Sequence, residues 1–408
     1  MKTRRQRKII VLLSLGVLAA ILGLLVEFVV YRYRNNRSMS FRAEGSQLQI
    51  SRDNKWREFI VKGVYVDSGQ SSNFTAGKDI SKKEYITWFK EFSAMNANVI
   101  KVYSIQTPEF YKAFYQYNLL ARKPLYLLHG IKVKGSNLEP YDNAYDDRLN
   151  AYLLEEIRQT IDVVHGKFSQ KQQASGLTEA YTMNIAPYVM GYILCGRMDS
   201  GFVLTTNQKN THVVGFEGDY LYTLNASPYE AWLAAVGNYV ISYEQDKYGG
   251  KSRLISWTNC ADANPVKYVN AEDMWKETVV NIDIEHIRTT EKFDTGIFAY
   301  YDVHPGFTDF ITRATGELSF YNAELSPYES YLKELKNHHT MPILAAEFGI
   351  SGSGDHSEIE QGEAIARIFD SIINFGFSGG VINARQTQDT TVASGLSYAI
   401  LQKKFSEY

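Results

Sequence analysis

Short apolar segments alternate with longer amphipathic segments over most of this chain. The apolar segments are too short for core helices and are rich in β-branched and aromatic residues, so we expect them to be strands. Runs that carry apolar residues at nearly every position are typical of parallel strands covered on both faces. Eight such strands are predicted, at 59–66, 98–105, 124–131, 188–196, 253–259, 296–303, 342–349 and 378–384.

The segments between them have the spacing of amphipathic helices. Six helices are predicted, at 81–96, 107–121, 148–168, 227–248, 326–339 and 357–376. Five of the helix starts carry a capping residue, namely Ser81, Thr107, Ser227, Ser326 and Ser357. The region 266–294 is the least regular, and "NIDIEHI" within it fits either an additional strand or a short helix.

Strands alternating with helices predict an α/β fold with a parallel sheet. Eight strands match the closed (β/α)8 barrel, also called the TIM barrel. A doubly wound open sheet is the alternative. No GxGxxG or Walker-type loop follows any predicted strand, which removes the usual nucleotide sites of open sheets and leaves no cofactor motif.

The amino terminus differs from the rest of the chain. "MKTRRQRK" carries five positive charges, and the 23 residues from Ile9 to Tyr31 contain one acid, Glu27. That length can cross a hydrocarbon core of about 30 Å, and it is longer than the apolar part of a signal peptide. We therefore expect a retained transmembrane helix, with the amino terminus in the cytoplasm and the barrel outside the cell membrane.

This reading divides the chain into four parts: a cytoplasmic tail at 1–8, the anchor at 9–31, a tether with an entry hairpin at 32–54, and the barrel at 55–408.

Composition narrows the class of partner. The net charge is −2, which makes nucleic acid an unsuitable partner. Aromatic residues make up 13%, including 29 Tyr, and they either fill a large core or line a groove where rings stack on sugars. The two cysteines, Cys195 and Cys260, form neither a disulfide scaffold nor a zinc pattern. They are expected either as separate core thiols or as one bridge between neighbouring strands.

The carboxyl ends of the strands are where a (β/α)8 barrel places its site. They carry many acids, amides and aromatic rings, but neither a three-ligand metal cluster nor a Ser-His-Asp pattern. This selection favours a carbohydrate substrate. The residues are Tyr65, Asp67, Lys101, Tyr103, His129, Arg197, Asp199, Trp257, Asn259, Tyr301, Asp302, His304, Glu347, Asn383 and Arg385.

The sequences around two of these strand ends resemble those of a known enzyme family. "NANVIKVYS" (96–104) and "AAEFG" (345–349), in order with "KGVYV", "PLYLLHGI" and "SPYEAWLA", resemble the catalytic barrel of family 2 and related clan A glycoside hydrolases. The chain is most similar to the barrels that bacteria carry beside membrane glycosyltransferases of exopolysaccharide synthesis. The resemblance covers about residues 55 to 400.

The resemblance implies a retaining mechanism, in which two carboxylates lie about 5–5.5 Å apart. Glu347, at the end of strand 7, falls on the nucleophile position. The acid/base position at the end of strand 4 aligns with Met198, which has no proton to give. Asp199, one residue further, and Glu217, in the following loop, are the two candidates to replace it.

Other positions depart from the family pattern. Lys101 stands where strand 2 usually gives an Arg, and strand 8 lacks its usual Trp, while strand 6 keeps Tyr300, Tyr301 and His304. Glu347 could therefore be an acid held by Lys101 in a buried ion pair. Asp67, His129 and His304 are individually more typical of loop-anchoring residues than of catalysts.

Two functions follow from the resemblance. The first is a weak or non-catalytic barrel that binds a polysaccharide such as a β-glucan and assists a membrane glycosyltransferase. The second is an active retaining glycosidase or transglycosylase with Glu347 as nucleophile. Loss of general acid catalysis typically costs 10²–10⁴-fold in rate, so the sequence slightly favours the first.

Overall fold

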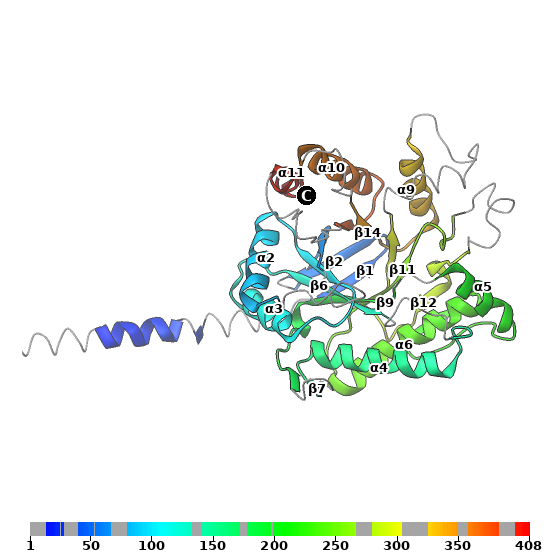
Figure 1. Ribbon diagram of the computed structural model, residues 1–408, viewed down its shortest axis with the longest axis horizontal. Coiled ribbons are helices and arrows are strands. Elements are labelled where there is room, and N and C mark those ends of the chain that lie inside the picture. Colours follow the sequence, from blue (N-terminus) through cyan, green and yellow to red (C-terminus); the bar gives the residue numbers. More distant parts are fainter. Residues whose placement is uncertain are drawn as a thin grey trace, which may run out of the picture.

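A closed barrel of parallel strands forms the body of the protein (Figure 1). The computed structural model describes residues 14–24, 26–27, 40–52, 54–66, 80–132, 141–171, 178–196, 199–266, 280–303, 325–349, 358–382 and 396–408. The eight barrel strands are β4 (Val61–Tyr65), β5 (Val99–Val102), β6 (Tyr126–Lys132), β9 (Val189–Cys195), β11 (Leu254–Asn259), β13 (Ala299–Asp302), β14 (Ile343–Phe348) and β15 (Gly379–Ile382).

These strands pair in chain order, and β15 pairs with β4 to close the sheet. Every pairing in the barrel is parallel. The predicted (β/α)8 barrel is therefore confirmed. The open doubly wound sheet is excluded, because such a sheet has two unpaired edges and this one has none.

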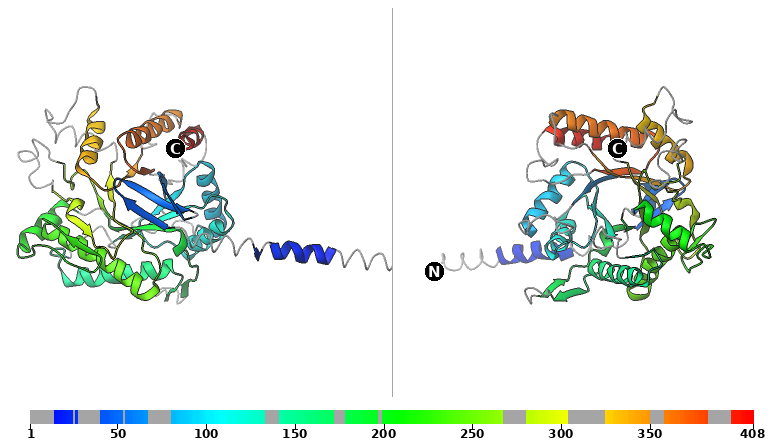
Figure 2. Two further views of the ribbon diagram at one scale, coloured as in Figure 1. Left: turned by 180° about the vertical axis from the view of Figure 1, so that it is seen from behind. Right: turned by 45° about the vertical axis from the view of Figure 1, so that its right-hand side comes forward.

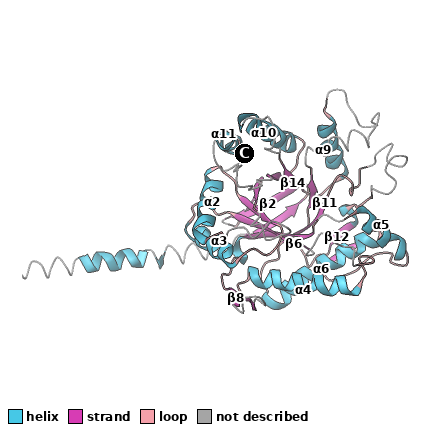
Figure 3. Cartoon of the chain, in the orientation of Figure 1, coloured by secondary structure: helices cyan, strands magenta, loops and turns pink. Residues whose placement is uncertain are grey.

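Helices surround the barrel, as Figure 3 shows by colour. The six predicted helices are present, and the structure adds α5 and α11. Their bounds are α2 (Lys82–Ala94), α3 (Pro108–Leu120), α4 (Asp147–Val164), α5 (Ser200–Lys209), α6 (Pro228–Tyr248), α9 (Pro327–His338), α10 (Glu358–Asn374) and α11 (Leu396–Ser406).

Local sequence signals set several helix starts. Ser81, Ser227 and Ser326 each form a full capping box with the Glu three residues later, which satisfies two backbone N–H groups at each start. Thr107 makes no side-chain cap, and Pro108 fills the first helical position there. Ser357 lies outside the described residues.

One part of the ring around the barrel contains no α-helix among the described residues. Between β11 and β13, the segment 280–289 contains a short 3-10 helix, η2 (Ile284–His286), and then β12 (Ile287–Thr289). β12 pairs antiparallel with β10 (Leu221–Thr223). "NIDIEHI" thus forms a helical turn leading into a strand, so each alternative for this region is correct in part.

A three-stranded antiparallel sheet covers the amino-terminal end of the barrel. It contains β1 (Ser40–Glu44), β2 (Gln47–Arg52) and β3 (Lys55–Glu58), so the expected entry hairpin has a third strand and reaches residue 58. Phe41, Leu48 and Ile50 from this sheet pack with Tyr126 and other inward-facing residues of the barrel. This sheet closes one pole, which leaves the opposite pole, at the carboxyl ends of the strands, for a site. A smaller hairpin, β7 (Phe168–Lys171) with β8 (Thr178–Tyr181), lies beside α4.

Side chains of each barrel strand alternate between two separate apolar clusters. In β6, Tyr126 and Leu128 belong to the cluster inside the barrel. Leu127 and Ile131 belong to the cluster between the barrel and the helices. The alternation has the period of two expected for a strand, and it fixes which strand-end residues can face a bound molecule.

The amino-terminal helix projects away from the barrel in all three ribbon views (Figures 1 and 2). Residues 14–24 and 26–27 are helical, and apolar side chains such as Leu18, Leu22 and Leu24 are exposed by more than half. Only part of the expected anchor, 9–31, falls within the described residues. Among those residues, no helix combines the length and the apolar character needed to span a bilayer.

Candidate functional site

A buried lysine surrounded by tyrosines lies inside the barrel towards the carboxyl ends of the strands. Lys101, on β5, is fully buried. Its Nζ lies 3.0 Å from the ring centroid of Tyr103, 5.1 Å from that of Tyr65 and 5.9 Å from that of Tyr300. Tyr65 and Tyr103 also contact each other edge to face, with centroids 4.7 Å apart. The negative faces of these rings stabilise a cation where water is excluded.

Tyr103 keeps its place because its neighbour on β6 has no side chain. A Cβ at Gly130 would lie 2.3 Å from the carbonyl oxygen of Tyr103, closer than van der Waals contact allows. Lys132, two residues further along β6, brings a second ammonium group to the same ring, 5.8 Å from its centroid. Together, Tyr65, Lys101, Tyr103, Lys132 and Tyr300 define what we call the barrel mouth.

Glu347 lies in β14, at the strand end where the resemblance places a nucleophile. The register between β14 and β15 shifts between Ala345 and Phe348, which marks a β-bulge at 346–347. Bulges at barrel rims often re-aim a side chain towards a site. The side chain of Glu347 is outside what the structure describes, so its predicted nearness to Lys101 stays a prediction.

The end of β9 has an unusual backbone. Cys195 has a φ of 67°, and the N–H of Gly196 donates to the carbonyl of Leu194 at 2.9 Å. This is the arrangement of a classic γ-turn, which is rare and strained. It stands immediately before Arg197 and Met198, which lie outside the described residues, so the acid/base position itself is not described.

The two candidate replacements for the missing general acid lie at the start of α5 and beyond that helix. Asp199 is the N-cap of α5, and its carboxylate accepts a hydrogen bond from the backbone N–H of Phe202 at 3.1 Å. Glu217 is exposed and forms an isolated bridge with Tyr222 beyond α5. Among the described contacts, none joins either carboxylate to the barrel mouth.

Four of the residues predicted to bind a sugar lie on the outer face of the barrel strands, towards the surrounding helices. His129 contacts Tyr111 of α3, and Trp257 donates through Nε1 to the carbonyl of Leu233 in α6 at 3.1 Å. Tyr301 contacts His339 with its hydroxyl at 2.6 Å, and Asn259 pairs in register with Tyr301 and so shares its face. Side chains of a strand alternate between two faces, and these four occupy the positions that point away from the barrel mouth.

His129 shows the consequence of this placement. Its Nδ1 donates to the carbonyl of Gly130 at 2.8 Å, so Nε2 accepts from the Tyr111 hydroxyl, also at 2.8 Å. Burial, only partly offset by the bond to Gly130, lowers the pKa of His129 to about 4. The ring is therefore a neutral link between β6 and α3 at pH 7.

The structure also shows residues that the sequence did not single out. Lys132 was missed although it continues the inward phase of Tyr126, Leu128 and Gly130. Thr258 shares the inward face of Tyr300 by register. Asp67, His304, Asn383 and Arg385, which were predicted at the mouth, lie outside the described residues.

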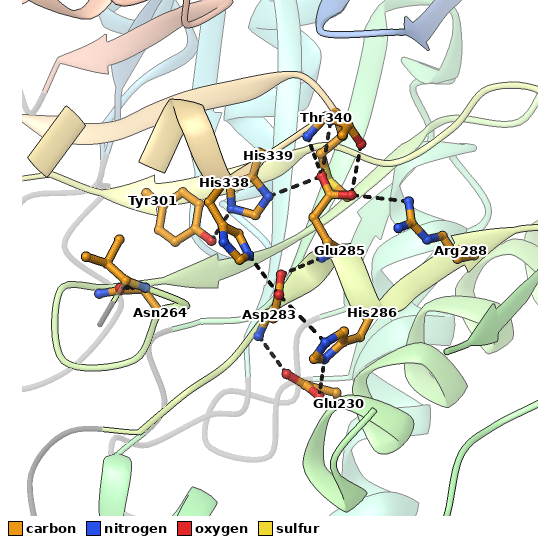
Figure 4. Close-up of polar contacts among 12 residues, drawn as sticks. Glu230, Asn264, Asp283, Glu285, His286, Arg288, Tyr301, His338, His339 and Thr340 are labelled. Atoms are coloured by element: carbon orange, nitrogen blue, oxygen red, sulfur yellow. Dashed lines mark hydrogen bonds and ion pairs between the residues drawn. The ribbon is translucent and has the colours of Figure 1, made fainter. Parts of the chain in front are cut away.

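A cluster of histidines and acids joins the segment 280–289 to its neighbours on the outside of the barrel (Figure 4). In one half, His286 Nδ1 donates to Glu230 at 2.9 Å, and His338 Nε2 donates to Asp283 at 2.8 Å. In the other half, Glu285 accepts from the backbone N–H of Thr340 at 2.8 Å.

This polar cluster, made of Glu230, Asp283, Glu285, His286, Arg288, His338, His339 and Thr340, connects α6, α9 and the start of β14. Within the residues described, no group of three His, Cys, Asp or Glu has the arrangement of a metal site. These contacts join η2 to α6, to α9 and to the segment before β14, which indicates a structural role for the cluster.

The two cysteines are both buried, at the end of β9 and just after β11. No disulfide joins them. Of the two expectations for this pair, separate core thiols are the state in the structure.

The comparisons with known proteins show the fold of this chain. No protein-family model matches the sequence, and no curated protein matches it. Among solved structures, the GH2 β-galacturonidase from Eisenbergiella tayi has a TM-score of 0.53 at 12% identity, over 91% of this chain and 54% of that chain. Gas2 in complex with compound 10 has a TM-score of 0.50 at 12% identity, over 90% of this chain and 69% of that chain.

The chain thus spans about half the length of the galacturonidase. Identities this low show the fold and not the activity. The comparisons and the closed parallel sheet agree that this chain has a (β/α)8 barrel fold.

Proposed function

We propose that the protein is a glycoside hydrolase-like barrel that binds a polysaccharide at the barrel mouth and has weak or no hydrolytic activity. The observation that supports this proposal is the set of tyrosines around Lys101 towards the carboxyl ends of the strands, among which Tyr103 is partly exposed. Tyrosine rings offer flat apolar faces with a polar edge, which suits stacking on sugar rings. The amino-terminal pole is filled by β1 to β3, so the carboxyl-terminal pole remains for the glycan.

The proposed weakness of hydrolysis rests on where the two candidate general acids lie. A general acid must lie within hydrogen-bond reach of the glycosidic oxygen. The carboxylate of Asp199 caps α5, and Glu217 is exposed beyond that helix. Neither arrangement supports proton donation at a sugar bound beside Tyr103.

An active retaining enzyme is the second candidate, and two observations favour it. Glu347 stands at a strand end beside a bulge. The strained turn at Cys195 immediately precedes the acid/base position, and strained backbone of this kind is concentrated at functional sites.

We further propose that residues 9–31 hold the protein in the cell membrane with the barrel on the outer side, where it assists a membrane glycosyltransferase that makes an exopolysaccharide. The apolar side chains exposed on residues 14–24 and 26–27 support a lipid environment. The length and charge pattern of 1–31 support a single crossing.

The test is a panel of β-glucans and other polysaccharides, measured for both binding and hydrolysis with the full chain in mild detergent. Tyr103→Ala should weaken binding, because stacking area is lost. Tyr408→Ala, a matched change two residues after α11, should not. If Tyr103→Ala and wild type bind every polymer equally, the mouth is not the binding site.

Glu347→Gln separates the two candidates. In a retaining enzyme this change abolishes turnover, because an amide cannot form the glycosyl-enzyme bond. In a binding barrel, wild type and Glu347→Gln both release no reducing sugar, and both bind the glycan.

A further inference from the structure

We propose that Lys132 makes the barrel mouth selective for a glycan carrying anionic groups, such as the carboxylates of uronic acids or sulfate esters. The inference rests on the proposed function and specifies the ligand of the same mouth. It depends on the position, the exposure and the unmatched charge of this one side chain.

Lys132 faces the inside of the barrel. It is the last residue of β6, and Tyr126 and Leu128, at the same phase of that strand, belong to the interior cluster. Its Nζ lies 5.8 Å from the ring centroid of Tyr103. A Cβ at Gly196 would lie 3.6 Å from Cγ of Lys132, so the stem of the lysine runs beside the turn that ends β9.

Exposure separates Lys132 from Lys101. Lys101 is fully buried under the tyrosines and offers no surface to a ligand. Lys132 is half-buried, so its ammonium group can reach a molecule that enters the mouth. A sugar stacked on the outer part of the Tyr103 ring would place its substituents next to this ammonium group.

The charge of Lys132 is not matched within the described part of the chain. Several other lysines there pair with acids, as Lys112 does with Glu109 at 2.7 Å and Lys247 with Asp162 at 2.9 Å. Among the described residues, Lys132 forms no ion pair, and its cation–π contact with the Tyr103 ring is the one polar interaction that it makes with them. Asp302 ends β13, three strands around the barrel from β6. A partly desolvated cation without a carboxylate attracts an anion, and a hydrogen bond between the two is charge-assisted.

The experiment compares three polymers: polygalacturonate, dextran sulfate and a neutral β-glucan. Binding is measured with the full chain in mild detergent at two salt concentrations. Lys132→Gln keeps most of the stem and removes the charge, and it should weaken binding of the anionic polymers by roughly tenfold to a hundredfold. Binding of the neutral glucan should fall much less than binding of the anionic polymers, and the salt dependence of anionic binding should decrease.

Two control variants accompany it. Lys132→Arg keeps the charge and should retain affinity for the anionic polymers. Lys403→Gln removes an exposed charge on α11 and should have no effect. Weakening for polygalacturonate alone would identify uronate as the ligand, and weakening for dextran sulfate alone would identify a sulfate ester.

Several results would overturn the inference. If Lys132→Gln weakens neutral and anionic polymers equally, Lys132 only shapes the mouth, and the proposed glycan binding still stands. The same conclusion follows if wild type prefers the neutral glucan. If wild type binds none of the three, the proposed function fails together with this inference.

Discussion

Glu285 offers the sharpest test of how the outer layer of the barrel is held together. Its side chain is 10% exposed. One carboxylate oxygen accepts from the backbone N–H of Thr340 at 2.8 Å and of Met341 at 3.2 Å. The other accepts from the Thr340 hydroxyl at 2.9 Å and lies 3.2 Å from Nη1 of Arg288. This one acid connects η2 to the start of β14.

The pKa of Glu285 gives the size of the effect. Burial alone would raise this pKa, but hydrogen bonds from His339, Met341 and Thr340 outweigh burial and lower it from 4.5 to about 2. A drop of that size means that folding stabilises the charged form of Glu285 over its neutral form by about 3 kcal/mol. Glu285→Gln has the shape of the neutral form, so it should reduce the free energy of unfolding at pH 7 by about 3 kcal/mol.

Thermal unfolding followed by circular dichroism, with the full chain in mild detergent, would show this loss as a fall in Tm of about 4 °C. Because the folded pKa is lower than the unfolded one, the stabilisation is present above about pH 4.5 and is lost as the pH falls towards 2. The Tm difference between wild type and variant should therefore shrink below pH 4. Glu363→Gln, in an exposed pair with Arg367, is the control and should change Tm little. An unchanged Tm for Glu285→Gln at pH 7, or a gap that widens in acid, would refute this account.

Three further outcomes are expected. The pKa of His286 is raised, mainly because the ring donates to Glu230, so the stabilisation by His286 is present below pH 6.5 and is lost as the pH rises through the folded pKa. His286→Gln should therefore be clearly less stable than wild type to urea at pH 6. A difference in stability between the two proteins that does not narrow by pH 9 would contradict this. Gly130→Ala should displace Tyr103, cost about 1–3 kcal/mol and weaken glycan binding, and a crystal structure of the variant with Tyr103 unmoved would disprove the steric argument. The full chain should stay in the membrane pellet after alkaline carbonate washing, and its release into the supernatant would remove the proposed anchor.

Sequence alone determined the architecture of the barrel and many of its local features. Eight apolar runs separated by helical segments predict a parallel sheet, and the structure has one strand for each run. The helix caps at Ser81, Ser227 and Ser326 could be predicted because capping involves residues three apart, with no help from the rest of the fold. Lys101, Tyr65 and Tyr103 were placed at one site because the carboxyl ends of parallel strands converge.

Only the tertiary structure decided which side of each strand faces the mouth. His129 and Trp257 were expected to bind sugar but lie under α3 and α6, while Lys132 faces inward. The physical reason is that a barrel strand is covered on both faces, so apolar residues occupy both phases of its alternation and the sequence does not mark the inner one. Long-range pairing decided the rest: β15 closes on β4 across most of the chain, and Glu285 meets Thr340, contacts that no local pattern encodes.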